Sequence, residues 1–363
     1  MQDRLLHPLG SGSFTTLVRL ISAYGCDLKF LPWLLPIGLS CVLRQPLAWL
    51  DAARYGGAVA RQPIDPPPIF IVGHWRSGTT HLQNLISQDR QFARVTLHQA
   101  AMPREFLCAP AKMVAGLQKM LPQTRLMDDV PVSADAPWEE EMALTSYGRL
   151  SFYHVSFFPR AVHRIFREAV MFDDGDAGLM AEWQRQYLHF LRKVQLVQPD
   201  RPLLLKNPAN TARIAILREM FPGAQFVHIH RDPYKVFAST VHLYLKTQQA
   251  WGLQTVDRDR IVRHVLASYP VLMEAFFRQR QGLPDSAMAD VRFQDLQRDP
   301  EGVLGTIYDQ LGLDGYEAAL PHFRRYIDAQ RSYRKNALSL FEGEKQQVGR
   351  CWGEIFHRLG YPV

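Results

Sequence analysis

Short apolar runs alternate with longer amphipathic segments through most of the chain. The runs have the length and composition of strands that are buried on both faces of a parallel sheet. They cover residues 69–72, 202–205, 225–230 and 289–293. Apolar residues at helical spacing predict helices over 79–88, 180–198, 212–220 and 234–249. This alternation indicates βαβ crossovers, and therefore an α/β fold with a parallel β-sheet flanked by helices.

The first 62 residues have a different pattern. They are amphipathic and helical, and breaks are expected near Pro32, Pro36 and Pro46. A proline-rich stretch over 62–68 then reads as a stiff linker into the first strand. We therefore divide the chain into a helical N-terminal appendage (1–62) and an α/β domain (63–363).

The apolar run 30–43 admits three interpretations. It packs against the main domain, lines an apolar acceptor site, or makes peripheral contact with a membrane. The run is too short for a membrane span, and two prolines interrupt it. Packing is the default expectation for a short apolar helix.

Composition narrows the classes of ligand. The net charge of +7 and the pI near 9.3 favour anionic ligands, but no block of lysine and arginine points to nucleic acid. The four cysteines lie far apart and lack metal-binding spacing, so no metal site or disulfide framework is expected. Reduced thiols and the lack of a signal-peptide pattern favour a cytoplasmic location.

The loop after the first strand carries the strongest motif. Gly73 and Gly78 have the spacing of a nucleotide-binding P-loop, and the helix that follows supplies an anion-binding N-terminus. Thr79 stands where nucleotide triphosphatases have lysine. Arg76 is the cation that the loop offers instead. The loop therefore suits a nucleotide with a shorter anionic chain that is handled without a metal.

Two other strand ends carry cations. Lys206 follows the second strand, and Arg231 follows the third. Ser239 comes eight residues after Arg231, in the second turn of the helix predicted over 234–249. Ligands of open parallel sheets bind at the carboxyl ends of the strands, so the three strand ends would face one crevice if the strands are neighbours. Arg231 and Ser239 can together hold one phosphate.

These residues resemble motifs of the sulfotransferases that use 3′-phosphoadenosine 5′-phosphosulfate (PAPS). The segment 76–80 (RSGTT) looks like their 5′-phosphosulfate loop, and 229–233 (IHRDP) through Ser239 resembles their 3′-phosphate motif. The segments 205–208 (LKNP) and 218–222 (REMFP) are similar to the middle of tyrosylprotein sulfotransferases. The segment 291–296 (VRFQDL) resembles their Arg-Tyr-Glu-Asp-Leu strand, with Gln294 in place of the glutamate. The resemblance covers residues 69–313, in the manner of the bacterial branch.

The resemblance implies a P-loop-type fold and a role for each residue. The 5′-phosphate would be held by Ser77, Gly78, Thr79 and Thr80. Arg76 would stabilise the leaving-group oxygen, and Lys206 would contact the sulfuryl group. Arg231 and Ser239 would bind the 3′-phosphate, which distinguishes PAPS from ATP. Sulfuryl transfer needs these cations and a general base, but no metal.

The general base is less sharply defined. His98 falls where the tyrosylprotein branch has its catalytic glutamate, and the resemblance to the cytosolic branch implies a histidine base. Glu105 and the triplet Glu139–Glu141 are the rivals. For the triplet, the alternative is a solvated helix N-terminus.

Two regions keep alternatives open. The basic cluster Arg324, Arg325, Arg331, Arg334 and Lys335 either closes over the 3′-phosphate or forms a solvated face. The aromatic run 152–158 and the N-terminal segment either line an apolar acceptor pocket or belong to the core. On the first interpretation, a lipid, sterol or other small alcohol is preferred as acceptor.

The leading prediction is therefore a PAPS-dependent sulfotransferase acting on a hydroxyl. A P-loop kinase or nucleotide triphosphatase is the alternative among enzymes. A nucleotide-binding protein without catalysis is the alternative from another class.

Overall fold

A computed structural model describes residues 7–124, 132–173, 177–330 and 340–363 of the chain. It divides into two compact units. The helical unit comprises Met1–Ile64, Val95–Pro199 and Leu243–Ile261, and the sheet unit comprises Asp65–Arg94, Asp200–His242 and Val262–Val363. The predicted division into 1–62 and 63–363 stays a prediction.

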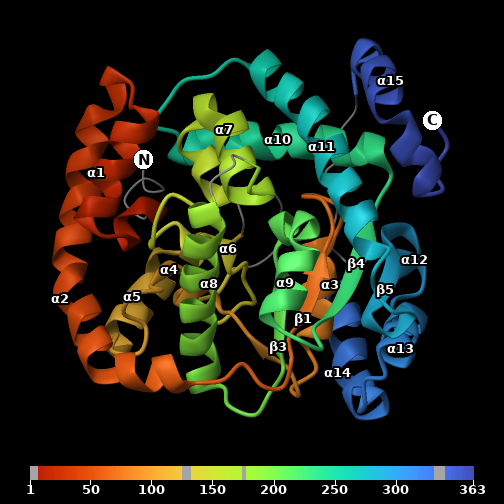
Figure 1. Cartoon of the computed structure of the whole chain (residues 1–363), viewed down its shortest axis with the longest axis horizontal. Coiled ribbons are helices and arrows are strands. Elements are labelled where there is room, and N and C mark those ends of the chain that lie inside the picture. The colour runs from red at the N-terminus through yellow and green to blue at the C-terminus, as the bar shows by residue number, and fades with distance from the viewer. Residues whose placement is uncertain (1–6, 125–131, 174–176, 331–339) are drawn as a thin grey trace. The chain divides into compact units, whose positions relative to one another are not determined.

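The sheet unit is built on five parallel strands in the order β2-β3-β1-β4-β5. The strands are β1 (Ile69–Val72), β2 (Ala93–Arg94), β3 (Leu203–Lys206), β4 (Gln225–His230) and β5 (Met288–Arg292). Strands β1 and β3 are buried along their whole length, as continuous apolar runs predict. The predicted parallel α/β fold is confirmed (Figure 1).

Helices cover both faces of this sheet. On one face, Ile71 and Val227 pack with α3 (Thr79–Ile86), α13 (Pro300–Leu311) and α14 (Tyr316–Ala329) in a single apolar cluster. On the other, Phe70 packs against Phe221, which follows α9 (Ile214–Met220), and His228 stacks on Phe276 of α11 (Arg258–Arg280). The remaining helices are α10 (Pro233–Trp251), α12 (Phe293–Arg298) and α15 (Glu342–Arg358).

The helical unit begins with α1 (Phe14–Tyr24) and the long helix α2 (Leu31–Arg61). It also contains α4 (Leu97–Ala101), α5 (Ala111–Met120), α6 (Glu141–Leu144), α7 (Val162–Phe166) and α8 (Ala177–Val197). The aromatic run 152–158 begins with a short 3₁₀ helix, Phe152–Ser156, and the side chains of Phe152, Phe157 and Phe158 are buried. Those side chains therefore belong to the core of the unit.

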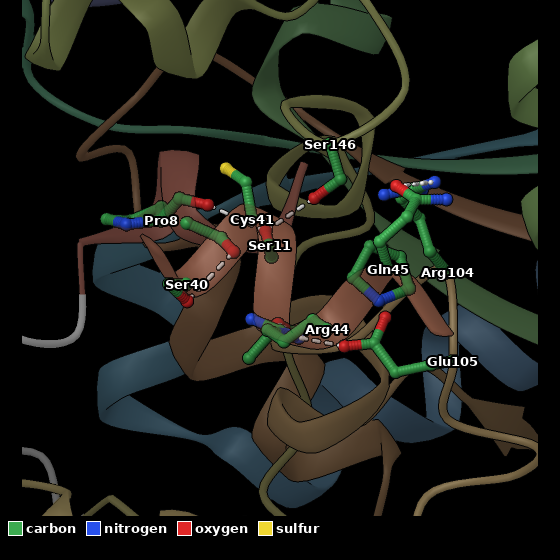
Figure 2. A network of polar contacts seen from close by, with 12 residues as sticks. Pro8, Ser11, Ser40, Cys41, Arg44, Gln45, Arg104, Glu105 and Ser146 are labelled. Atoms are coloured by element: carbon green, nitrogen blue, oxygen red, sulfur yellow. Dashed lines mark hydrogen bonds and ion pairs between the residues drawn. The ribbon is translucent and has the colours of Figure 1, made fainter. Parts of the chain in front are cut away.

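Helix α2 corrects two expectations. It runs without a break through Pro36 and Pro46, where interruptions were expected. Polar contacts on its inner face hold it in place: Cys41 and Ser40 donate to the carbonyls of Leu9 and Gly10, and Arg44 is paired with Glu105 (Figure 2). These contacts offset the hydrogen bonds that the prolines cannot make.

The second correction concerns length and burial. Within the described ranges, one helical stretch, Leu28–Arg61, is long and apolar enough to cross a membrane by length and composition, although core helices and signal sequences can pass the same test. The run 30–43 is thus part of a longer apolar helix than expected. Only 17% of an apolar 18-residue stretch within this helix is buried, so the packing interpretation is wrong for most of its side chains.

A buried ion pair joins α2 to α8. The Lys193 ammonium lies 2.7 Å from an Asp51 carboxylate oxygen and donates to the Pro103 carbonyl at 2.9 Å. The other Asp51 oxygen accepts from the backbone N–H of Leu107. Burial lowers the pKa of Lys193, and hydrogen bonding to Asp51 opposes that shift. Removing only one partner of such a pair destabilises the folded state most, because the other charge is left buried without compensation.

We expect Lys193→Met to lower the free energy of unfolding by about 3–5 kcal/mol, because it leaves the Asp51 carboxylate buried without its cation. The double variant Asp51→Asn with Lys193→Met should recover part of that loss. Urea denaturation of the three proteins measures both effects. A loss below about 1 kcal/mol in the single variant, the range of exposed pairs, would contradict the assignment.

Candidate active site

The phosphate loop lies between β1 and α3, and two glycines determine its path. Gly73 has φ +141°, and a Cβ there would lie 2.2 Å from the Ile229 carbonyl oxygen of β4. Gly78 has φ +109°, and a Cβ there would lie 2.3 Å from the Phe293 ring. A side chain at either position would collide and would also require a strained backbone. The loop is therefore held flat against the sheet end.

Hydrogen bonds from neighbouring elements hold the loop at both ends. The Gly73 N–H donates to the Thr211 hydroxyl at 2.8 Å, and the Thr240 hydroxyl donates to the Trp75 carbonyl at 3.4 Å. The Ser77 N–H donates to the His74 carbonyl within the loop. No local pattern pointed to Thr211 or Thr240, because their role depends on which elements the fold brings together.

The N-terminus of α3 supplies the anion-binding part of the loop. Gly78 caps the helix, and Thr79 and Thr80 open it. The first N–H groups of a helix have no acceptor within it, and the helix dipole adds partial positive charge there. The Ser77 N–H donates inside the loop, and the role of Ser77, Gly78, Thr79 and Thr80 in holding the 5′-phosphate stays a prediction.

Arg76 and Ser239 lie in direct contact. The Arg76 Nε donates to the Ser239 hydroxyl at 2.8 Å, and Arg76 has a positive φ of 71° that few non-glycine residues adopt. Ser239 is in α10, the helix that follows β4. The structure therefore joins a residue predicted for the 5′ end of the nucleotide to one predicted for its 3′-phosphate.

Lys206 and Arg231 stand on either side of the loop. Lys206 ends β3, is 2% exposed, and donates from Nζ to the Thr80 hydroxyl at 3.3 Å. The Arg231 guanidinium lies 4.7 Å from the centre of the Phe293 ring, the same ring that Gly78 contacts. Phe293 thus positions both the loop and a predicted phosphate ligand.

The condition set for the convergence of the three strand ends, that their strands are neighbours, is met. Strand β1 lies between β3 and β4, so Arg76, Lys206 and Arg231 follow three adjacent strands. Three cations and a helix N-terminus at one sheet edge make this edge suited to a ligand with more than one anionic group. The roles assigned to the individual residues stay predictions.

His98 belongs to the helical unit, whereas the phosphate loop belongs to the sheet unit. It lies in the first turn of α4, whose N-cap is Thr96. Its Nδ1 is 3.0 Å from the Thr96 hydroxyl and 3.6 Å from an Asp135 carboxylate oxygen. The side chain is 21% exposed. In the neutral tautomer that carries its proton on Nδ1, Nε2 is the ring nitrogen with the accepting lone pair.

The rival bases are engaged in the packing of the helical unit. Glu105 is buried and paired with Arg44 at 2.5 Å, and burial raises its pKa. Glu140 accepts a hydrogen bond from the Tyr187 hydroxyl at 2.8 Å, and Glu141 accepts one from the Phe152 N–H at 2.7 Å. Both are buried, so a solvated helix N-terminus is wrong for them. Their contacts favour a structural role.

Part of the predicted C-terminal basic cluster can be located. Arg324 binds Glu301 through two guanidinium nitrogens, at 2.9 and 3.0 Å, on the surface of the sheet unit. Arg325 is exposed on the same helix. Arg331, Arg334 and Lys335 lie outside the described residues.

His74, inside the loop, is a site residue that sequence reasoning missed. It is 4% exposed, lies against Tyr269 with ring centroids 4.7 Å apart, and donates from Nδ1 to the Trp75 carbonyl. Burial lowers its pKa to about 4. The imidazole is therefore neutral at physiological pH and contributes packing rather than charge.

Comparison with known proteins gives matches to sulfotransferases. Residues 67–318 match the model of the sulfotransferase family. The chain is 33% identical to omega-hydroxy-beta-dihydromenaquinone-9 sulfotransferase Stf3 of Mycobacterium bovis and of Mycobacterium tuberculosis. Each of these alignments covers 307 residues, 85% of this chain and 78% of the relative.

Solved structures show the same fold at lower identity. Sulfotransferase STF9 from Mycobacterium avium aligns with a TM-score of 0.70 and 20% identity, over 87% of this chain and 82% of that one. Sulfotransferase STF1 from Mycobacterium tuberculosis aligns with a TM-score of 0.64 and 19% identity, over 96% of this chain and 93% of that one.

The buried His74 predicts a pH dependence of stability. Its pKa is lowered in the folded state, so the unfolded chain binds a proton first as the pH falls. Its contribution is present above pH 6.5 and is lost as the pH falls toward 4, by about 3 kcal/mol at full effect. Replacement by asparagine, which cannot titrate, should flatten the pH profile of the unfolding free energy over this range. An unchanged slope in His74→Asn would show that His74 does not contribute.

Proposed function

Because the chain belongs to the sulfotransferase family, we propose that it transfers the sulfuryl group of PAPS to a hydroxyl group of an apolar acceptor. The sulfotransferase activity predicted from the sequence is confirmed by the family match and by the identity to named sulfotransferases. The donor, the acceptor and the residue roles are the proposed part.

The observation that carries the choice of donor is the contact between Arg76 and Ser239, which lies in α10, the helix that begins two residues after Arg231. A nucleotide with phosphates at both its 3′ and 5′ positions needs cations at two places. Arg76 and the first turn of α3 would hold the 5′ end, and Arg231 with Ser239 would hold the 3′-phosphate. Thr79, where triphosphatases have lysine, fits a donor without a γ-phosphate.

The proposed transfer is a single in-line displacement. The acceptor oxygen attacks sulfur, the bond from sulfur to the phosphate oxygen breaks, and the acceptor proton passes to His98. The products are a sulfate ester and adenosine 3′,5′-bisphosphate. Lys206 would stabilise charge on the sulfuryl oxygens, and Arg76 would stabilise charge on the leaving oxygen. The step needs no metal.

For the acceptor, we propose a lipid or another apolar alcohol. The relatives that are 33% identical are named for a menaquinone carrying an omega-hydroxy group, which is a lipid alcohol. A cytoplasmic location with peripheral contact to a membrane through 30–43 would give the enzyme access to such acceptors. Incubation with PAPS and a lipid extract, followed by mass spectrometry for products that gain one SO₃ group, tests the acceptor class.

Arg231→Ala should weaken the binding of adenosine 3′,5′-bisphosphate by roughly ten- to a hundredfold, because a charge-assisted hydrogen bond is lost. The affinity for adenosine 5′-phosphate, which lacks the 3′ group, should change little. Isothermal titration with both nucleotides measures the difference. Arg218→Ala is the control, since this guanidinium binds the Gly282 carbonyl on the exposed surface of the sheet unit. Equal weakening for both nucleotides would refute the 3′-phosphate assignment.

His98→Ala should lower kcat by about 10²–10⁴-fold, as loss of a general base does, without weakening nucleotide binding. Lys206→Ala should also lower kcat, and the exposed Lys235→Ala serves as its control. If both His98→Ala and Lys206→Ala keep full turnover, the chemistry resides elsewhere.

A further inference from the structure

Helix α2 presents a continuous apolar stripe to the outside of the helical unit. The exposed positions recur at spacings of three and four residues, so they share one face of the helix. They are Leu31, Pro32, Leu35, Leu39, Val42, Leu43, Pro46, Trp49, Leu50 and Ala53. Leu35 is 77% exposed, Leu43 68% and Trp49 65%. At 1.5 Å per residue the stripe is roughly 33 Å long, and no charged side chain interrupts it.

Helix α1 widens this stripe. Gly38 of α2 has no side chain, which lets the Phe14 ring approach so closely that a Cβ there would lie 3.3 Å from it. Phe14 and Val18, one helical turn apart, are about half exposed beside the stripe. Exposed apolar surface of this extent is uncommon on a protein that acts alone in water.

The opposite face of α2 is committed to the interior of the helical unit. The buried positions Ile37, Cys41, Ala48 and Asp51 lie on it. Figure 2 shows its polar contacts: Arg44 with Glu105, Gln45 with Arg104, and Ser40 and Cys41 with the chain near Pro8. The helix is therefore held in one rotational setting, with its apolar stripe turned outward.

The charges around the stripe have one sign. Lys29 precedes it and is exposed, and Arg54 and Arg61 follow it and are exposed. The acidic residues in 7–61 are Asp51, which is buried, and Asp27, which binds Arg160. The cations at both ends of the stripe match the anionic headgroups of a bilayer, and the apolar side chains match its acyl layer. Tryptophan is typical of the interface between the two layers.

We propose that the face formed by α1 and α2 binds the surface of an anionic lipid bilayer, with α2 lying in the plane of the interface. The apolar stripe enters the boundary between headgroups and acyl chains, and Lys29, Arg54 and Arg61 bind the lipid phosphates. This inference rests on the described residues of the helical unit and does not depend on the proposed reaction.

Two other arrangements fit the same face less well. A spanning helix would place Arg44 and Asp51 in hydrocarbon and would break their contacts with Glu105 and Lys193. Pairing of two copies along the stripe would bring cationic ends together in either relative direction, which is unfavourable.

The experiment is sedimentation with vesicles of phosphatidylcholine alone or with 30 mol% phosphatidylglycerol, roughly the anionic content that attracts basic segments. The wild-type chain should bind the anionic vesicles at least about tenfold more tightly, and high salt should weaken that binding. The double variant Leu39→Glu, Leu43→Glu should lose about tenfold or more, since it places two carboxylates in the stripe. The control is Met120→Glu, Val197→Glu, because those residues are similarly exposed in the same unit. It should bind as the wild type does.

Other results would overturn the proposal. Failure of the wild type to bind, or equal binding by the stripe variant with circular dichroism unchanged, excludes this face as the lipid contact. Retention in the bilayer after washing at high salt and high pH indicates a spanning helix. A concentration-dependent doubling of mass that Leu39→Glu, Leu43→Glu abolishes, without vesicle binding, indicates a second copy of the chain as the partner.

Discussion

The phosphate loop can lie against strand β4 only because two of its positions carry no side chain. At Gly73 the constraint is the Ile229 carbonyl of β4, and at Gly78 it is the Phe293 ring that follows β5. The close approach at Gly78 has a second result, since the same ring lies beneath the Arg231 guanidinium. One packing constraint thus sets both the path of the loop and the position of a cation on the neighbouring strand.

The sheet unit was predictable because its signals are local. Strands β1 and β4 were located to the residue, and β3 and β5 to within about one residue, because apolar runs bounded by turn residues predict buried parallel strands. The convergence of the three cations was predicted on the condition that their strands are neighbours, and the order β3-β1-β4 meets that condition. The contacts of Thr211 and His74 could not be predicted, because they join segments that only the folded chain brings together.

The errors lay in the helical unit, where tertiary contacts override local rules. Proline is expected to break a helix, yet α2 passes through Pro36 and Pro46 because its other face is anchored by Cys41, Arg44 and Asp51. Likewise, consecutive glutamates suggest a solvated helix start, whereas Glu140 and Glu141 are buried by partners that are distant in sequence, Tyr187 and Phe152. Local propensity is a weak guide where packing supplies the partners.

The prolines of α2 also limit how deep this helix can lie in any apolar medium. Pro36 and Pro46 have no N–H to donate to the carbonyls of Pro32 and Val42, four residues earlier, and those two residues are on the exposed side. A carbonyl without a donor is costly in hydrocarbon but is readily hydrated. These two carbonyl oxygens therefore favour a shallow position of α2, at which water can still hydrate them.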